Sequence, residues 1–262
     1  MPVDINFMLT DKIYENMRTP LFLRAIQHPP KWANDEILAW DQQYFNSVQA
    51  FIRHHYWTSQ GSVNVFQVVG TAHQQYQHRP WLDLLTSGKR MDINLPLQHK
   101  NPEYYRNTSS KVPMMYFNTL DGIHYYIGSD GNHRTCIAKF MFYETGETQL
   151  HGVTINHYDV HHAFYQLFQQ LQHKVKQLNL PITITPMSQP IKREDTSGWM
   201  IDYFETYLLR QEYIPSVNDE HIEKLNYEQA QQKFSDLSAQ FLLKKQNTNV
   251  QKSFWKTIFP FK

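Results

Sequence analysis

The chain has little cysteine, little glycine and no long apolar run. Its 262 residues include one cysteine, Cys136, so neither an intrachain disulfide, a cysteine-based zinc site nor a CxxC redox centre can form. No apolar stretch approaches the ~20 residues that cross a bilayer. The segment from Met1 to Phe7 lacks the basic and apolar regions of a signal peptide. These absences predict a cytoplasmic protein without a transmembrane segment.

Neither sign of charge is in excess. Lys plus Arg number 25 and Asp plus Glu number 24, which gives a formal net charge of +1. This balance excludes a nucleic-acid coat held mainly by bulk charge, although it leaves a local basic patch open. Hydrophobic residues make up 41% and aromatic residues 15%, which is enough for a sizeable core. Because glycine occurs only 9 times, a segment that contains two glycines close together is unusual in this chain.

The patterning predicts an α+β protein with helical N- and C-terminal extensions. Residues 1 to about 60 are expected to be mainly helical, with a second helix that starts near Asn34 or Asp35 and carries apolar residues as far as Ile52. The run 63–69, which Gly70 ends, favours a strand. We expect three parts: a helical part over 1–100 that packs on the core, a core motif over 101–160, and a helical part over 161–262.

The middle of the chain carries the clearest signals. An extended stretch over 111–117, an Asp121-Gly122 turn and a return strand over 123–128 predict a hairpin. A helix over 135–143 that ends at Gly146, and a strand over 149–156, follow. Beyond His157 an apolar stripe predicts a helix. The proline-broken stretch 180–190 is either linker or edge structure, and further helices are expected over 199–209 and 227–243.

The loop 128–134, with the sequence GSDGNHR, carries the chemistry. A helix that starts near Asn132 exposes backbone N–H groups and the positive end of its dipole. Gly128 and Gly131 let a ligand approach the backbone closely. His133 and Arg134 in the first turn are disfavoured by the dipole unless an anion lies between them and the N–H groups. The loop therefore indicates a phosphate site. The alternative is a turn that Asp130 caps and in which Arg134 pairs with a carboxylate.

The segment 125–140, YYIGSDGNHRTCIAKF, resembles the second signature box of the ParB/sulfiredoxin superfamily, and the resemblance extends over about 111–157. It implies a small mixed ParB/sulfiredoxin-like sheet, in which the residues from Gly131 to Arg134 correspond to the phosphate-gripping turn of a nucleotide pocket. Asn132 occupies the position of the catalytic cysteine of sulfiredoxins, so reduction of a sulfinic acid is unsupported. Residues 158–180 show no helix-turn-helix, which argues against site-specific partition binding.

The residues of the loop 128–134 and the family resemblance together predict a nucleotide-binding enzyme. This enzyme would be either a phosphotransferase, such as a kinase, or an NTPase, and would use ATP, ADP or CTP with Mg²⁺. The expected catalytic residues are Asp130, His133 and Arg134. The expected nucleotide-binding residues are Gly128, Ser129, Gly131, Asn132, His133, Arg134 and Thr135. Two alternatives remain open: a plasmid- or phage-type DNA-associated protein (a nuclease or a CTP-gated DNA binder) and a non-enzymatic protein-interaction module.

Several other features stay unresolved at this level. Helix residues Ile137, Ala138, Phe140 and Met141 are expected to pack on the sheet, and Cys136 is expected to face the core. An upstream catalytic acid could be Asp83, Asp92 or Glu103.

The cluster His157, Asp159, His161 and His162 is either a metal site or polar decoration of a helix. The C-terminal aromatic tail, with Phe254, Trp255, Ile258, Phe259 and Phe261, could bind a protein partner or a membrane surface, or fold back on the domain.

Overall fold

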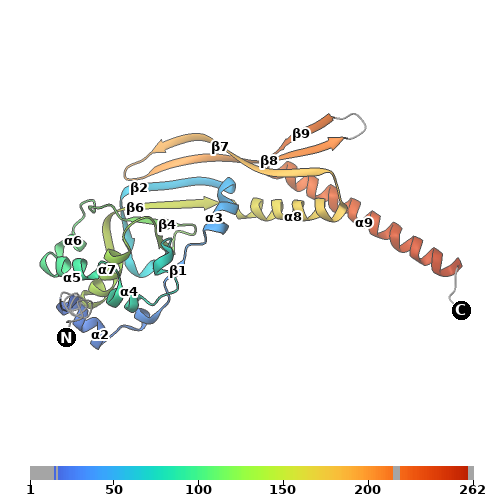
Figure 1. Cartoon of the computed structure of the whole chain (residues 1–262). Coiled ribbons are helices and arrows are strands. Elements are labelled where there is room, and N and C mark those ends of the chain that lie inside the picture. Colours follow the sequence, from blue (N-terminus) through green and yellow to red (C-terminus); the bar gives the residue numbers. More distant parts are fainter. Residues whose placement is uncertain (1–14, 16, 215–218, 259–262) are drawn as a thin grey trace, which may run out of the picture. The chain divides into compact units, whose positions relative to one another are not determined.

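A computed structural model describes residue 15 and residues 17–214 and 219–258 of the chain (Figure 1). It divides into two compact units, each built from separate stretches. The first unit takes the described parts of 1–46, 54–159 and 193–202, and the second takes 47–53, 160–192 and the described parts of 203–262. No helix within the described residues combines the length and the apolarity that a membrane span requires.

The first unit is built on a mixed sheet. Its strand order is β1 (Leu38–Ala39), β3 (Val68–Thr71), β5 (Tyr125–Ile127), β4 (Tyr116–Thr119), β6 (Gln149–Val160) and β2 (Ile52–Asn64). The pairs β1/β3, β3/β5 and β4/β6 are parallel, whereas β4/β5 is antiparallel. The expected α+β class is therefore confirmed.

The predicted hairpin is present at β4 and β5. Phe117 pairs with Ile127 in the antiparallel register. The turn forms because Asp121 Oδ1 accepts hydrogen bonds from the backbone N–H groups of Ile123 and His124, at 2.9 and 2.8 Å, and Gly122 takes a φ of +71°.

Helix α7 (Asn132–Thr145) is the central helix of this unit, because 10 of its 14 residues are buried. Ile137, Ala138 and Phe140 are no more than 1% exposed, and Cys136 is fully buried, as the sequence predicts. The buried cluster that contains them also includes strand residues such as Phe117. Gly146 ends the helix in the left-handed region, with a φ of +74°.

Among the described residues of the first unit, the helices α2 (Pro20–Gln27), α4 (Trp81–Ser87), α5 (Met91–Lys100) and α6 (Glu103–Arg106) accompany α7. Of these, α2, α4 and α5 contact α7. The expectation of a mainly helical segment up to residue 60 is wrong in part. The predicted helix over 34–52 is broken into β1, the short α3 (Gln42–Val48) and a 3-10 turn, and β2 begins at Ile52.

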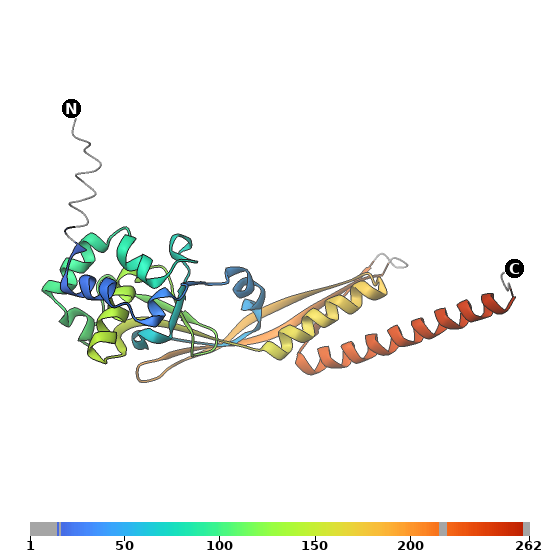
Figure 2. The same ribbon diagram turned by 90° about the horizontal axis from the view of Figure 1, so that it is seen from below.

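The second unit contains α8 (His162–Leu178), most of the long strands β7 (Ile182–Asp195) and β8 (Met200–Ile214), β9 (Asp219–Leu225) and the described part of α9 (Tyr227–Ile258). Strand β8 neighbours β7 and pairs with β9 in antiparallel register. Helix α8 runs along the β7–β8 hairpin in both views (Figure 1 and Figure 2). The predicted apolar stripe of α8 is buried at Phe164, Leu167, Phe168 and Leu171, whereas Ala163 is exposed.

The helix predicted over 199–209 is wrong, because this segment is the first part of β8. Aromatic and β-branched residues, among them Ile201, Tyr203 and Thr206, favour a strand once partner strands are available. The stretch 180–190 belongs largely to β7, which lies at the end of the strand order, and this position tolerates Pro186 and Pro190. In the aromatic tail, Phe259 and Phe261 lie outside the described residues, and only the backbone of 243–258 is described.

Candidate functional site

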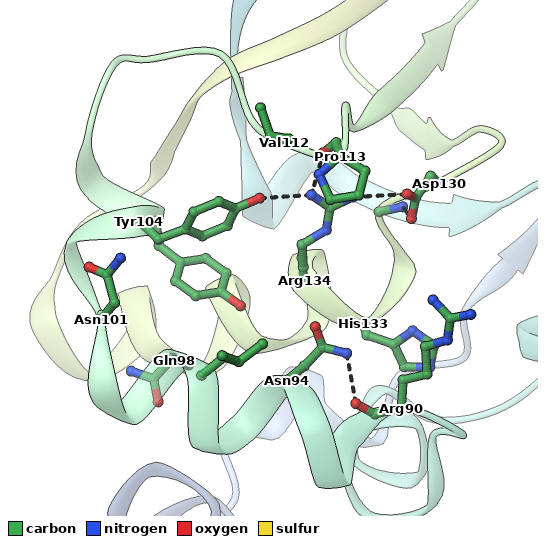
Figure 3. A pocket seen from close by; sticks show the side chains of 13 residues that line it. Arg90, Asn94, Gln98, Asn101, Tyr104, Val112, Pro113, Asp130, His133 and Arg134 are labelled. Atoms are coloured by element: carbon green, nitrogen blue, oxygen red, sulfur yellow. Dashed lines mark hydrogen bonds and ion pairs between the residues drawn. The ribbon is translucent and has the colours of Figure 1, made fainter.

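A cavity of about 340 Å³ lies in the first unit at the N-terminus of α7 (Figure 3). One face of α5, the segment 101–105, the Val112-Pro113 loop and the start of α7 form its walls. The lining residues are Arg90, Asn94, Leu97, Gln98, Asn101, Tyr104, Tyr105, Val112, Pro113, Asp130, Gly131, His133 and Arg134. Four predicted site residues, Asp130, Gly131, His133 and Arg134, therefore share one cavity.

The start of α7 depends on Gly131. This residue is the N-cap, with a φ of +123° that L-residues rarely adopt, and a Cβ placed there would lie 3.3 Å from Met115 Cε. No side chain caps the helix, and the Asp130 carboxylate instead accepts the Gly131 N–H at 2.6 Å. The first backbone bond of α7 runs from Thr135 N–H to Gly131 O. The N–H groups of Asn132 to Arg134 thus have no acceptor within the helix.

Arg134 is held by the wall of the cavity. Its Nη1 donates to Tyr104 Oη at 2.7 Å and to the Pro113 carbonyl, and its Nη2 donates to the Met114 carbonyl at 3.4 Å. The same guanidinium forms an ion pair with Asp130 at 3.1 Å. The predicted alternative, in which Arg134 pairs with a carboxylate, is thus present. Arg134 joins three segments of the wall, and its residue is only 8% exposed.

His133 is a neutral imidazole at physiological pH. Burial, followed by the positive charge of Arg90, lowers its pKa to about 4. Its Nε2 lies 3.2 Å from Tyr76 Oη, and the two rings meet edge to face. A neutral imidazole carries one donor and one acceptor, so His133 offers a hydrogen bond rather than a fixed charge. Titration near neutrality, which the sequence suggests for a histidine, is not what this environment produces.

Arg90 is a cavity residue that the sequence analysis missed. It precedes α5 as its N-cap, and its side chain is exposed and lies beside His133 in Figure 3. No ion pair involving its guanidinium occurs among the described residues. The sequence signal was a Lys89-Arg90 pair just before a helix, but nothing in the sequence connects it with Gly131, which lies 41 positions further along the chain.

The other predicted site residues do not line the cavity. The Asn132 amide oxygen accepts the Thr71 hydroxyl at 2.7 Å, and Thr135 is fully buried. Gly128 packs against Tyr116, whereas Ser129 is exposed. The three candidate upstream acids, Asp83, Asp92 and Glu103, are likewise absent from its walls; Asp83 pairs with Arg79 at 2.6 Å and Glu103 with Arg106 at 3.0 Å.

The histidine cluster 157–162 gives no metal centre in the described part of the chain, where no three His, Cys, Asp or Glu side chains converge. His157 and Asp159 belong to β6 rather than to a helix. Asp159 pairs with His54 at 2.8 Å, and His161 is the N-cap of α8. The helical i, i+4 spacing that suggested a metal site is therefore not realised.

Comparisons of the chain with protein-family models, with curated proteins and with solved structures find no match. The resemblance of segment 125–140 to the ParB/sulfiredoxin superfamily therefore stays a prediction.

Proposed function

We propose that the cavity at the start of α7 binds the phosphates of a nucleotide, and that the chain is a phosphotransferase or an NTPase of ParB/sulfiredoxin-like fold. The observation that carries the proposal is that the exposed guanidinium of Arg90 and the N-terminus of a 14-residue helix line the same cavity. Backbone N–H groups, a helix dipole and an arginine fork together suit a phosphate.

The charge of the cavity supports an anionic ligand. Arg90 and Arg134 both line it, and Asp130 is the one carboxylate among the described residues that do so. The dipole of α7 adds roughly half a positive charge at Gly131. Because Asp130 already pairs with Arg134, the guanidinium of Arg90 and the helix end account for the remaining positive potential.

The roles that we propose for the cavity residues differ from those that the sequence assigned. Arg90 takes over the phosphate contact that the sequence assigned to Arg134, and Arg134 positions Tyr104, the 113–114 backbone and Asp130. Phosphoryl transfer breaks the bond to the leaving phosphate oxygen and forms one to an acceptor hydroxyl or water, which loses its proton. The neutral imidazole of His133, whose pKa is about 4, can accept a hydrogen bond from that hydroxyl or water and orient it, while the proton passes to a phosphate oxygen or to solvent.

Mg²⁺ fits the cavity only as a partner of the nucleotide. One carboxylate, Asp130, lines the cavity; its Oδ1 already accepts the Gly131 N–H, and its Oδ2 forms an ion pair with Arg134. Such a site suits Mg²⁺ when phosphate oxygens and waters complete the octahedron. When bound, the ion would neutralise charge on the transferring phosphoryl group.

Calorimetric titration with ATP, ADP, CTP and GTP, each with and without Mg²⁺, tests the proposal. We expect Arg90→Ala to weaken nucleotide binding by tenfold or more, because a charge-assisted bidentate contact is lost. Lys89→Ala is the matched control, since Lys89 is an exposed neighbour that does not line the cavity. Absence of binding, or an unchanged affinity in Arg90→Ala, would refute the proposal, and salt-dependent DNA binding or cleavage would favour the DNA-associated alternative.

A further inference from the structure

One face of α5 forms the wall of the cavity opposite α7. Arg90, Asn94, Leu97, Gln98 and Asn101 all line the cavity, and their spacing of 4, 3, 1 and 3 residues places them on one side of a helix. Figure 3 shows Gln98 and Asn101 on the opposite side of the cavity from Asp130 and His133. Asp130 and His133 therefore lie at one end of the cavity and the carboxamides of Gln98 and Asn101 at the other, with Arg134 between them beside Tyr104.

Gln98 is buried without a full set of partners. Its residue is 8% exposed, and its Nε2 donates only to the thioether of Met141, at 3.6 Å. No hydrogen bond among the described residues uses its Oε1. Gln98 lines the cavity, so this acceptor is available to a ligand that carries an N–H donor.

Apolar surface also lines the cavity. Leu97 is 57% exposed and Val112 is 79% exposed, and both line the cavity. The rings of Tyr104 and Tyr105 complete the lining there. We call the set Leu97, Gln98, Asn101 and Val112 the base end. None of these four residues is charged, and the Arg134 guanidinium beside Tyr104 is already bound by Tyr104, the Pro113 carbonyl and Asp130.

Resting on the proposed function, we propose that the base end binds the heterocyclic base of the nucleotide. A nucleobase has flat apolar faces and an edge of N–H donors and acceptors, which match Leu97 and Val112 on the one hand and the carboxamides of Gln98 and Asn101 on the other. The phosphates then extend toward Arg90 and Gly131. A sugar phosphate or an inorganic polyphosphate would leave the apolar residues and Gln98 Oε1 without partners.

The test separates the contribution of the base to the binding affinity from that of the phosphates, in the wild type and in two matched variants. Calorimetry measures the affinity of ATP, CTP, GTP and UTP, and of inorganic tripolyphosphate as a probe without a base. Leu97→Gln makes the base end more polar without adding charge, and Ile93→Gln is the control. Ile93 lies one turn earlier on α5 and is similarly exposed, at 55%, but it does not line the cavity.

We expect the wild type to bind at least one nucleotide more tightly than tripolyphosphate. Leu97→Gln should weaken that nucleotide about five- to tenfold, the loss that burial of part of an apolar side chain predicts, and leave tripolyphosphate unchanged. Ile93→Gln should change neither affinity. Equal affinity for tripolyphosphate and every nucleotide would overturn the base end while sparing the phosphate site. Binding of neither class would overturn the proposed function itself.

Discussion

At the scale of single residues, the environment of His133 is set by its neighbours more than by its own chemistry. Burial removes water from the imidazolium, and Arg90, His73 and Arg134 add positive charge around it, whereas Asp130 opposes them only in part. The folded-state pKa of about 4 lies below the usual 6.5. Folding therefore favours the neutral ring, and the stability that this preference contributes is present above pH 6.5 and is lost as the pH falls toward 4.

Replacing Arg90 by alanine should raise the pKa of His133. One of the positive charges that oppose the imidazolium is removed, while the burial that contributes most remains, so the expected pKa lies between about 4 and the usual 6.5. Two-dimensional NMR of the histidine ring, recorded from pH 3.5 to 8, measures it. The free energy of unfolding should also fall less steeply between pH 6.5 and 4 in this variant. An unshifted His133 titration would show that Arg90 does not lie close to the ring in solution.

The buried ammonium of Lys139 shows how local context decides the role of a charged residue. Lys139 lies in α7 and is 4% exposed, and its ammonium donates to the carbonyls of Val65 and Val68 at 3.0 and 2.9 Å. The same group lies 4.4 Å from the centre of the Trp81 ring. Burial lowers its pKa to about 8. Two backbone carbonyls and the face of an aromatic ring thus surround this ammonium, which gives Lys139 a structural role.

At the scale of elements, the two glycines at the ends of α7 should differ in the free energy of unfolding that their replacement by alanine costs. Gly146 has a φ of +74°, and a Cβ there would meet no atom within 4 Å. Gly146→Ala should therefore cost only the left-handed backbone penalty of about 1 kcal/mol. Gly131 has a φ of +123°, outside the left-handed helical region, and its added Cβ would press on Met115. Gly131→Ala should cost more, about 1–3 kcal/mol.

Chemical denaturation measures both stabilities, and nucleotide titration separates the roles of the two glycines. Gly131→Ala should also weaken nucleotide binding, because it disturbs the helix end that lines the cavity. Gly146→Ala, at the far end of the same helix, should leave the affinity unchanged. A Gly131→Ala protein as stable as Gly146→Ala would mean that the backbone at residue 131 relaxes to an ordinary conformation.

Local signals explain which elements the sequence predicts correctly. Asp121 with Gly122 specifies the hairpin turn, and Gly131 and Gly146 bound a helix whose burial follows from its apolar residues. Strand β8 is missed because Ile201 and Tyr203 fit a helix as well as a strand until the neighbouring strand β7 supplies a partner. The cavity wall is missed for a related reason: Arg90 and Leu97 reach Gly131 only through tertiary packing, which no spacing in the sequence records.

At the scale of the whole molecule, the first unit has one core that draws on the chain from Met17 to Ile155. Phe22 of α2 and Leu85 of α4 belong to the same buried cluster as Phe140 of α7. Residues 101–160 contain the loop 128–134 and five elements of secondary structure (α6, β4, β5, α7 and β6), but they do not contain the helices that contact α7 from the N-terminal side. The segment of resemblance and the folding unit are therefore different lengths of chain.

A fragment of residues 101–160 should accordingly not fold alone. Without α2, α4 and α5, the apolar side chains of α7 that are now fully buried would face water, and a 60-residue chain has little other surface to bury. We expect far-UV circular dichroism without a cooperative thermal transition. The matched fragment 1–160 retains every residue of the buried cluster and should unfold cooperatively. Cooperative unfolding of 101–160 would show instead that the first hundred residues are an addition to an autonomously folding core.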